Sequence, residues 1–140
     1  MRIFYFSPDH NAPSGGIKVI YNHATILREN GFEAFILHSK KGFKSTWFEN
    51  KCPLKYLSEI SFLPTDIVVI PEIFFHLAAN PELNLKDRIR NFRGKKTDYY
   101  GAKFIWQSVA KKIVFNQNAY HTFLDFSTKY PLNYHLFDIP

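Results

Sequence analysis

The stretch that decides the fold reads RIFYFS at 2–7, PDHNAPSGG at 8–16 and IKVIYNHATILREN at 17–30, and it is closed by Gly31. The first segment has the apolar character of a β-strand. The third repeats apolar residues at helical spacing along one face: Ile17, Ile20, Tyr21, Ala24 and Leu27. Ser14 or a glycine after Pro13 can cap the start of this helix, and Gly31 can adopt the left-handed conformation that ends helices. The segment therefore predicts a strand, a glycine-containing loop and an amphipathic helix.

The remaining chain continues the alternation of strands and helices. FEAFILH at 32–38 reads as a second strand, which completes a βαβ unit. DIVVI at 66–70 has the unbroken apolar run of a strand buried on both faces. The other expected elements are a short strand at 54–57, a short helix at 73–79, an amphipathic helix at 102–110 and a last strand at 112–116. Lys111 and Lys112 would then complement the dipole at the end of the second long helix.

These elements predict a single-domain α/β fold with a Rossmann-like, open, mainly parallel sheet of about five strands and helices on both faces. Residues 1–123 would form the domain. Residues 124–140 are an aromatic-rich tail without a clear period, which could begin a further element.

Composition narrows the class of protein. The 140 residues carry a net charge of +6, from 18 Lys and Arg against 12 Asp and Glu. Such a surface suits anionic partners, although solubility alone explains the number as well. Cys52 is the single cysteine, which fits a reducing compartment. With no signal peptide and no apolar run of about 18 residues, we expect a cytoplasmic protein, with contact at a membrane surface left open.

Ligands of open parallel sheets bind at the carboxyl ends of the strands. Here that edge would be lined by residues 8–16, 38–41, 71–72 and 116–121. Gly15 and Gly16 lie between a strand and a helix start, where outward-pointing amides form an anion site. A phosphate contact and a plain tight turn explain this pair about equally well. The loop lacks both G-x-G-x-x-G and the Lys-Ser/Thr of a P-loop.

Other polar residues at this edge have a structural reading beside a functional one. Glu72 could orient a hydroxyl or act as a base, although capping the next helix is the favoured reading. The amides of Gln117 and Asn118 suit hydroxyl-rich ligands or loop anchoring. Tyr120 and His121 could stack on a sugar ring or pack in the core. The lysines at 40–41 could meet a phosphate, but a solvated loop is favoured.

Several site classes are not supported by the sequence. The basic cluster at 88–96 could hold anionic lipid, but solvated surface is the favoured reading, and without a nucleic-acid motif we expect no nucleic-acid partner. The six histidines are scattered without metal-ligand spacing, so we expect no metal. We expect no cofactor either, and the residues support no catalytic triad.

The combination of PSGGIKVIYNHATILRENGFEAFILH, DIVVIPE and KIVFNQNAYHTF resembles the N-terminal domain of GT-B-type retaining glycosyltransferases, family 4 or group 1. The resemblance covers residues 1–123. It implies an acceptor-binding domain that faces a second domain, which holds the nucleotide-sugar donor. It also implies that Gly15 and Gly16 approach the donor diphosphate. Many members have a histidine after the last strand, and its nearest counterpart here is Asn118, which cannot act as a base.

The resemblance further implies a sugar acceptor as the partner, with Glu72, Gln117, Asn118, Tyr120 and His121 as candidate contacts. The donor domain does not lie within these 140 residues, so the chain would be an excised domain, a truncated product or half of a split enzyme. We expect it to transfer no sugar alone, and transfer by the purified chain would contradict this. The alternatives are a non-catalytic interaction module on the same scaffold, which self-association would favour, and, less favoured, an NADP-type nucleotide-binding domain.

Overall fold

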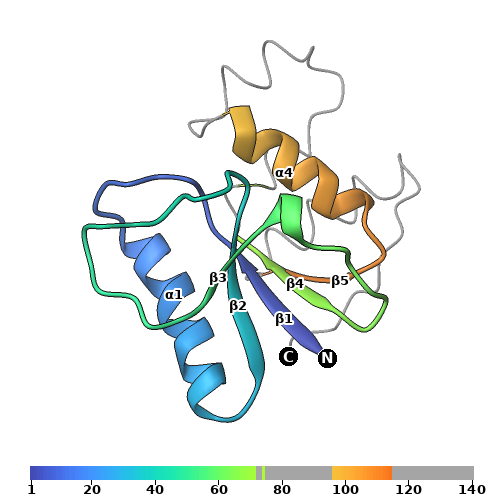
Figure 1. The fold of residues 1–140 in the computed structure, drawn as a ribbon, viewed down its shortest axis with the longest axis horizontal. Helices are drawn as coiled ribbons and strands as arrows, with labels where there is room; N and C mark the ends of the chain where they lie inside the picture. The colour runs from blue at the N-terminus through green and yellow to red at the C-terminus, as the bar shows by residue number, and fades with distance from the viewer. Residues whose placement is uncertain (72–73, 75–95, 115–140) are drawn as a thin grey trace.

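The computed structural model describes residues 1–71, 74 and 96–114. Within them, five strands form one parallel sheet in the order β3-β2-β1-β4-β5 (Figure 1). The strands are β1 (Arg2–Phe6), β2 (Glu33–His38), β3 (Leu54–Tyr56), β4 (Ile67–Ile70) and β5 (Lys111–Val114). The helices are α1 (Gly15–Glu29), the 3-10 turn η1 (Leu57–Glu59) and α4 (Lys96–Gln107). The expected α/β parallel fold is confirmed.

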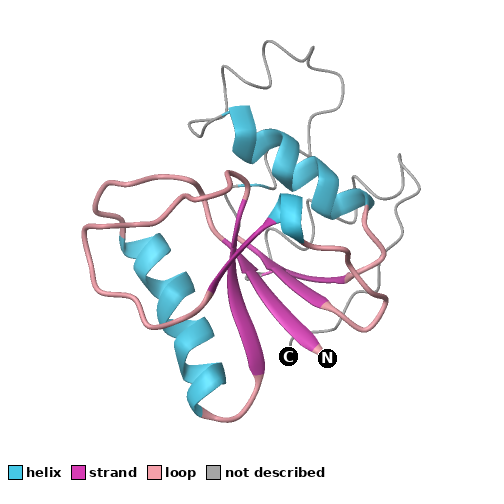
Figure 2. Cartoon of the chain, viewed as in Figure 1, coloured by secondary structure: helices cyan, strands magenta, loops and turns pink. Residues whose placement is uncertain are grey.

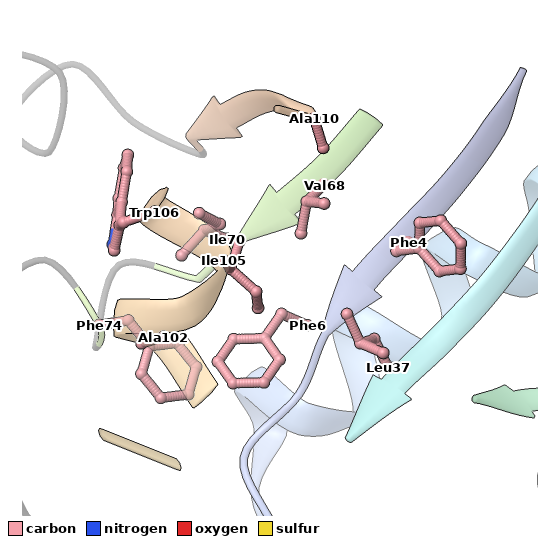
Figure 3. Close-up of a cluster of buried hydrophobic side chains, with 10 residues drawn as sticks. All are labelled: Phe4, Phe6, Leu37, Val68, Ile70, Phe74, Ala102, Ile105, Trp106 and Ala110. Atoms are coloured by element: carbon pink, nitrogen blue, oxygen red, sulfur yellow. The ribbon is translucent and has the colours of Figure 1, made fainter. Parts of the chain in front are cut away.

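Helices cover both faces of the sheet, as Figures 1 and 2 show for α1 and α4. The alternation of β1 explains how the faces divide, because neighbouring side chains of a strand point to opposite sides. Ile3 and Tyr5 join the cluster that packs under α1, whereas Phe4 and Phe6 join the cluster under α4. Figure 3 shows this second cluster, in which the rings of Phe6 and Phe74 lie 4.6 Å apart.

The strand order places a topological switch point between β1 and β4. The chain leaves β1 through α1 toward β2 and β3 on one side, and it continues from β4 to β5 on the other. β1 pairs in parallel with both β2 and β4. In open parallel sheets the crevice for ligands opens at such a point, outside the carboxyl ends of the strands.

The second long helix differs from its expected bounds. It begins at Lys96 rather than 102 and ends at Gln107, and Val109, expected on its buried face, is 51% exposed. The prediction that Lys111 and Lys112 complement the end of this helix is wrong. Both lie in β5, where they pair with Ile67 and Val68 of β4.

Lys112 is buried on the α4 side of the sheet, and its Nζ donates a hydrogen bond to the Ser108 carbonyl that follows α4. Burial lowers the pKa of Lys112 to about 8, against about 10.4 for lysine in an unfolded chain. Between these values the unfolded chain binds a proton that the folded chain does not, so stability rises with pH.

We therefore expect the free energy of unfolding to rise by about 2 kcal/mol between about pH 8 and pH 10. Lys112→Met should abolish this rise, as measured by urea unfolding across the range. The control is Lys55→Met, since Lys55 is exposed on β3. A pH dependence that survives Lys112→Met would contradict the assignment.

Candidate functional site

The candidate site lies at the carboxyl edge of the sheet, where β1 ends at Phe6 and β2 ends at His38. Residues 7–14 lead from β1 to α1 without regular secondary structure, with bends at Asp9 and Ala12. Because α1 follows β1 directly, the helix starts at this edge with Gly15 and Gly16 as its first two residues. The predicted juxtaposition of the glycine pair with the strand ends is therefore present.

Ser14 caps the start of α1. It has an extended backbone, and its side chain accepts a hydrogen bond from the Ile17 amide at 3.5 Å. Its carbonyl accepts from the Lys18 amide at 3.1 Å. Within the described residues no hydrogen bond uses the amides of Gly15 or Gly16. These two donors are oriented outward in the way that an anion at a helix start requires.

Neither glycine is required by the fold that surrounds it. Only Gly31 and Gly42 have positive φ among the described glycines, so Gly15 and Gly16 have backbones that any residue adopts. A Cβ added at Gly15 would meet nothing within 4 Å, and one at Gly16 would lie 3.9 Å from Ser14 Oγ. Both residues are exposed. Neither a positive φ nor close packing therefore requires glycine at these two positions.

Asp9 is the centre of a buried network that holds the loop before α1. Its amide donates to the Asp98 carboxylate of α4, at 3.1 and 3.2 Å from the two oxygens. Its own carboxylate lies 3.0 Å from His38 Nδ1 and accepts from the Lys40 amide at 2.8 Å. The side chains of Asp9, His38 and Asp98 are almost completely buried. The network thus joins the loop to β2 on one side and to α4 on the other.

Tyr21 of α1 completes the network, because its hydroxyl lies 2.7 Å from His38 Nε2. Burial raises the pKa of Tyr21 to about 12, so the phenol keeps its proton at neutral pH. With the phenol as donor to Nε2, the ring proton of His38 lies on Nδ1 and is donated to Asp9. Every polar atom of the imidazole is then satisfied, as a buried ring requires.

A second link joins the loop before α1 to the loop after β2. Asn11 Nδ2 donates to Thr46 Oγ1 at 2.9 Å, and the Thr46 amide donates to Asn11 Oδ1 at 2.8 Å. The loop after β2 carries the lysines expected at this edge. Lys40 is exposed, whereas Lys41 forms an ion pair with Glu59 at 3.1 Å.

Comparisons of the chain with protein-family models, with curated proteins and with solved structures find no match. Among the described residues, no three His, Cys, Asp or Glu side chains lie together as a metal site would need. Over the same residues, the structure has no helix with the length and apolarity needed to cross a membrane.

Of the residues singled out from the sequence, Gly15 and Gly16 lie in the described part of the structure. Glu72, Gln117, Asn118, Tyr120 and His121 lie outside it, as do the expected helix at 73–79, most of the basic cluster at 88–96 and the tail at 124–140. Sequence reasoning missed the roles of Asp9, Tyr21 and Asp98. One signal in the sequence could have indicated the contact between Asp9 and His38. His38 ends one apolar strand and Asp9 closely follows another, and parallel strands bring such residues to the same edge of the sheet.

Proposed function

We propose that this chain forms the acceptor-side half of a GT-B-type retaining glycosyltransferase, with the start of α1 facing the diphosphate of a nucleotide-sugar donor. The observation that carries the proposal is the exposed pair Gly15–Gly16. The two backbone amides make no hydrogen bond within the described residues, and the fold would accommodate a side chain at either position. The parallel sheet and its switch point give that pair the position expected for a ligand edge.

The proposed role of this helix start is electrostatic. When a sugar leaves its nucleotide, negative charge accumulates on the departing diphosphate. Backbone amides and the positive end of a helix dipole stabilise charge that develops close to them. In a helix each Cα–Cβ bond tilts toward the N-terminus, so side chains at 15 and 16 would project toward the phosphate. Glycine keeps that approach clear.

The first experiment titrates inorganic pyrophosphate into the ¹⁵N-labelled chain and follows the backbone amides by NMR. We expect millimolar binding, with the largest shifts at Gly15 and Gly16. A Gly15→Ala/Gly16→Ala variant should bind about tenfold more weakly, or not at all, because charge-assisted hydrogen bonds to amides contribute about 1.5–3 kcal/mol each. The variant should be at least as stable as the wild type, since glycine within a helix costs about 0.5–1 kcal/mol relative to alanine.

The matched control is Asn22→Ala, at an exposed position of the same helix. This change also improves helix propensity but leaves the first turn untouched, so pyrophosphate affinity should not change. Wild-type chain without shifts at Gly15 and Gly16, or a double-alanine variant that binds like the wild type, would overturn the proposal. A parallel titration with NADPH examines the nucleotide-binding alternative. Tighter binding that shifts residues 38–41 would favour that alternative.

A sugar acceptor and a nucleotide-sugar donor follow as partners from the same proposal. Acceptor recognition is assigned to Glu72 and to the segment at 117–121. It is tested by adding a panel of simple sugars and glycosides to the labelled chain and following the amides of those residues. If none of the sugars or glycosides shifts the amides of Glu72 or of residues 117–121, and pyrophosphate still shifts those of Gly15 and Gly16, acceptor recognition is overturned and only diphosphate binding is supported.

A further inference from the structure

The buried Asp9–His38 pair lies at the foot of the loop that carries the proposed ligand site. A loop that lacks regular secondary structure depends on side-chain hydrogen bonds for a fixed conformation. Here the loop at 7–14 is held at three places before the helix cap. The Ser7 amide donates to the Leu37 carbonyl at 3.0 Å, Asp9 joins the buried network, and Asn11 exchanges hydrogen bonds with Thr46.

Ser7 and Asp9 are both entirely buried, and of the two only Asp9 carries a carboxylate. A carboxylate removed from water needs donors on both oxygens. His38 serves one oxygen and the Lys40 amide serves the other. Both donors belong to β2 or to the residues just after it, so they are fixed by the sheet. The carboxylate of Asp9, five residues before the cap at Ser14, is therefore held by the end of β2, while its amide is held by Asp98 of α4.

We propose that His38 is a positioning residue for the ligand site, acting through Asp9 to set the path of the 7–14 loop into Gly15 and Gly16. This inference rests on the proposed function. His38 has no exposed surface and so does not touch a ligand itself. Its other nitrogen contacts Tyr21 within α1, so its two hydrogen bonds reach the site by different routes. The link to Asp9 orients the loop, whereas the link to Tyr21 fixes the body of the helix.

Two substitutions separate these routes. In His38→Asn the amide Nδ2 takes the place of Nδ1, so the hydrogen bond to Asp9 is kept and the one to Tyr21 is lost. In His38→Gln the longer amide reaches the place of Nε2, so the contact with Tyr21 is kept and the one to Asp9 is lost. Both remove one buried hydrogen bond and part of the ring, so each serves as the stability control for the other.

The first readout needs no ligand. We expect the amide resonances of Gly15 and Gly16 to stay in place in His38→Asn and to move in His38→Gln. The second readout is pyrophosphate affinity, which should fall about tenfold in His38→Gln relative to His38→Asn, because small misplacements of a binding group are costly. Urea unfolding of both variants shows whether affinity merely follows stability.

Asp9→Asn provides a second variant of similar size, in case His38→Gln does not fold. It should move the same two amides. It should also transfer the ring proton of His38 from Nδ1 to Nε2, which imidazole ¹⁵N shifts report. Equal behaviour of His38→Asn and His38→Gln, or unmoved glycine amides in both His38→Gln and Asp9→Asn, would overturn the positioning role. Failure of wild-type chain to bind pyrophosphate would instead overturn the proposed function, while the ligand-free readout still decides whether His38 positions the loop.

Discussion

Replacing Asp66 by alanine is expected to lower the free energy of unfolding by about 3 kcal/mol at pH 7, because a buried carboxylate with several donors is removed. Asp66 is 1% exposed. Its oxygens accept from Arg2 Nε at 2.9 Å, from Arg2 Nη2 at 2.6 Å and from the Leu63 amide at 2.8 Å. These contacts tie the start of β1 to the turn before β4. Urea unfolding of the variant beside the wild type measures the loss.

Asp66 should also make the free energy of unfolding depend on pH in the acidic range. Burial opposes its ionisation, but the hydrogen bonds from Arg2 and Leu63 hold the pKa of Asp66 below its usual value. For a carboxyl with a lowered folded pKa, the stabilisation is complete above the unfolded value of about 3.9 and is lost as the pH falls through the folded one. The gap between wild type and Asp66→Ala should therefore shrink below about pH 4.

The control for Asp66 is Glu59→Gln, which removes the exposed ion pair with Lys41. Exposed pairs contribute about 0–1 kcal/mol, so little change is expected at any pH. A gap between wild type and Asp66→Ala that stayed constant from neutral to acidic pH would contradict the role given to this carboxylate.

Gly101→Ala is the second substitution with a large expected effect, also about 3 kcal/mol of destabilisation, at the upper end of what overpacking costs. Gly101 faces the end of β2 from the middle of α4. An added Cβ would lie 2.2 Å from Ser39 Oγ, 2.8 Å from Leu57 Cδ1 and 3.1 Å from Ser39 Cβ. The Leu57 tip and the Ser39 hydroxyl can rotate, but Ser39 Cβ is attached to the backbone that directly follows β2, so the helix must shift away from it. Thermal or urea unfolding reports the loss.

A second substitution at the contact tests this reading. Ser39→Gly removes both Ser39 atoms that the new methyl group meets. Gly101→Ala should therefore cost much less in a Ser39→Gly background than in the wild type, and the two effects should be strongly non-additive. Additive effects would mean that Gly101 matters for another reason. Comparing Lys103→Ala with Lys103→Gly, at an exposed position of the same helix, measures the backbone difference between alanine and glycine without the contact.

The first βαβ unit was predictable because its signals are local and agree with one another. The expected strand at 2–7, helix at 17–30 and strand at 32–38 appear as β1, α1 and β2 with small shifts at their ends. Ser14 is the cap, and Gly31 has the positive φ of 84° expected at a helix end. β4 was equally clear, since IVVI is buried between two strands.

The start of α4 was missed because a buried residue there is charged. Asp98, Ala102 and Ile105 share one face of the helix, and all three are buried. A pattern of apolar residues does not count the aspartate, so the expected helix began six residues too late. Asp98 is buried because it accepts the Asp9 amide from 89 residues away. No local pattern contains that partner.

The candidate site divides in the same way. The glycine pair was visible as a motif, and its place at the carboxyl edge followed from strand order. The sequence could not show that both positions have room for a larger side chain, because this depends on the atoms that surround each position in space. The Asp9–His38–Tyr21 network was also hidden, because its members come from three elements and are joined only by the parallel pairing of β1 with β2.

The two outer strands of the described sheet bear on how the protein avoids aggregation. Central strands as apolar as IVVI would template fibrils if their edges were open. β3 is only three residues long and carries the exposed Lys55 at its middle, while β5 is four residues long and begins with Lys111. Short edges and lysines discourage a second sheet from adding to the first. The apolar central strands of this sheet are thus flanked by short strands that pair poorly with strands of another chain. This disfavours aggregation while the chain folds.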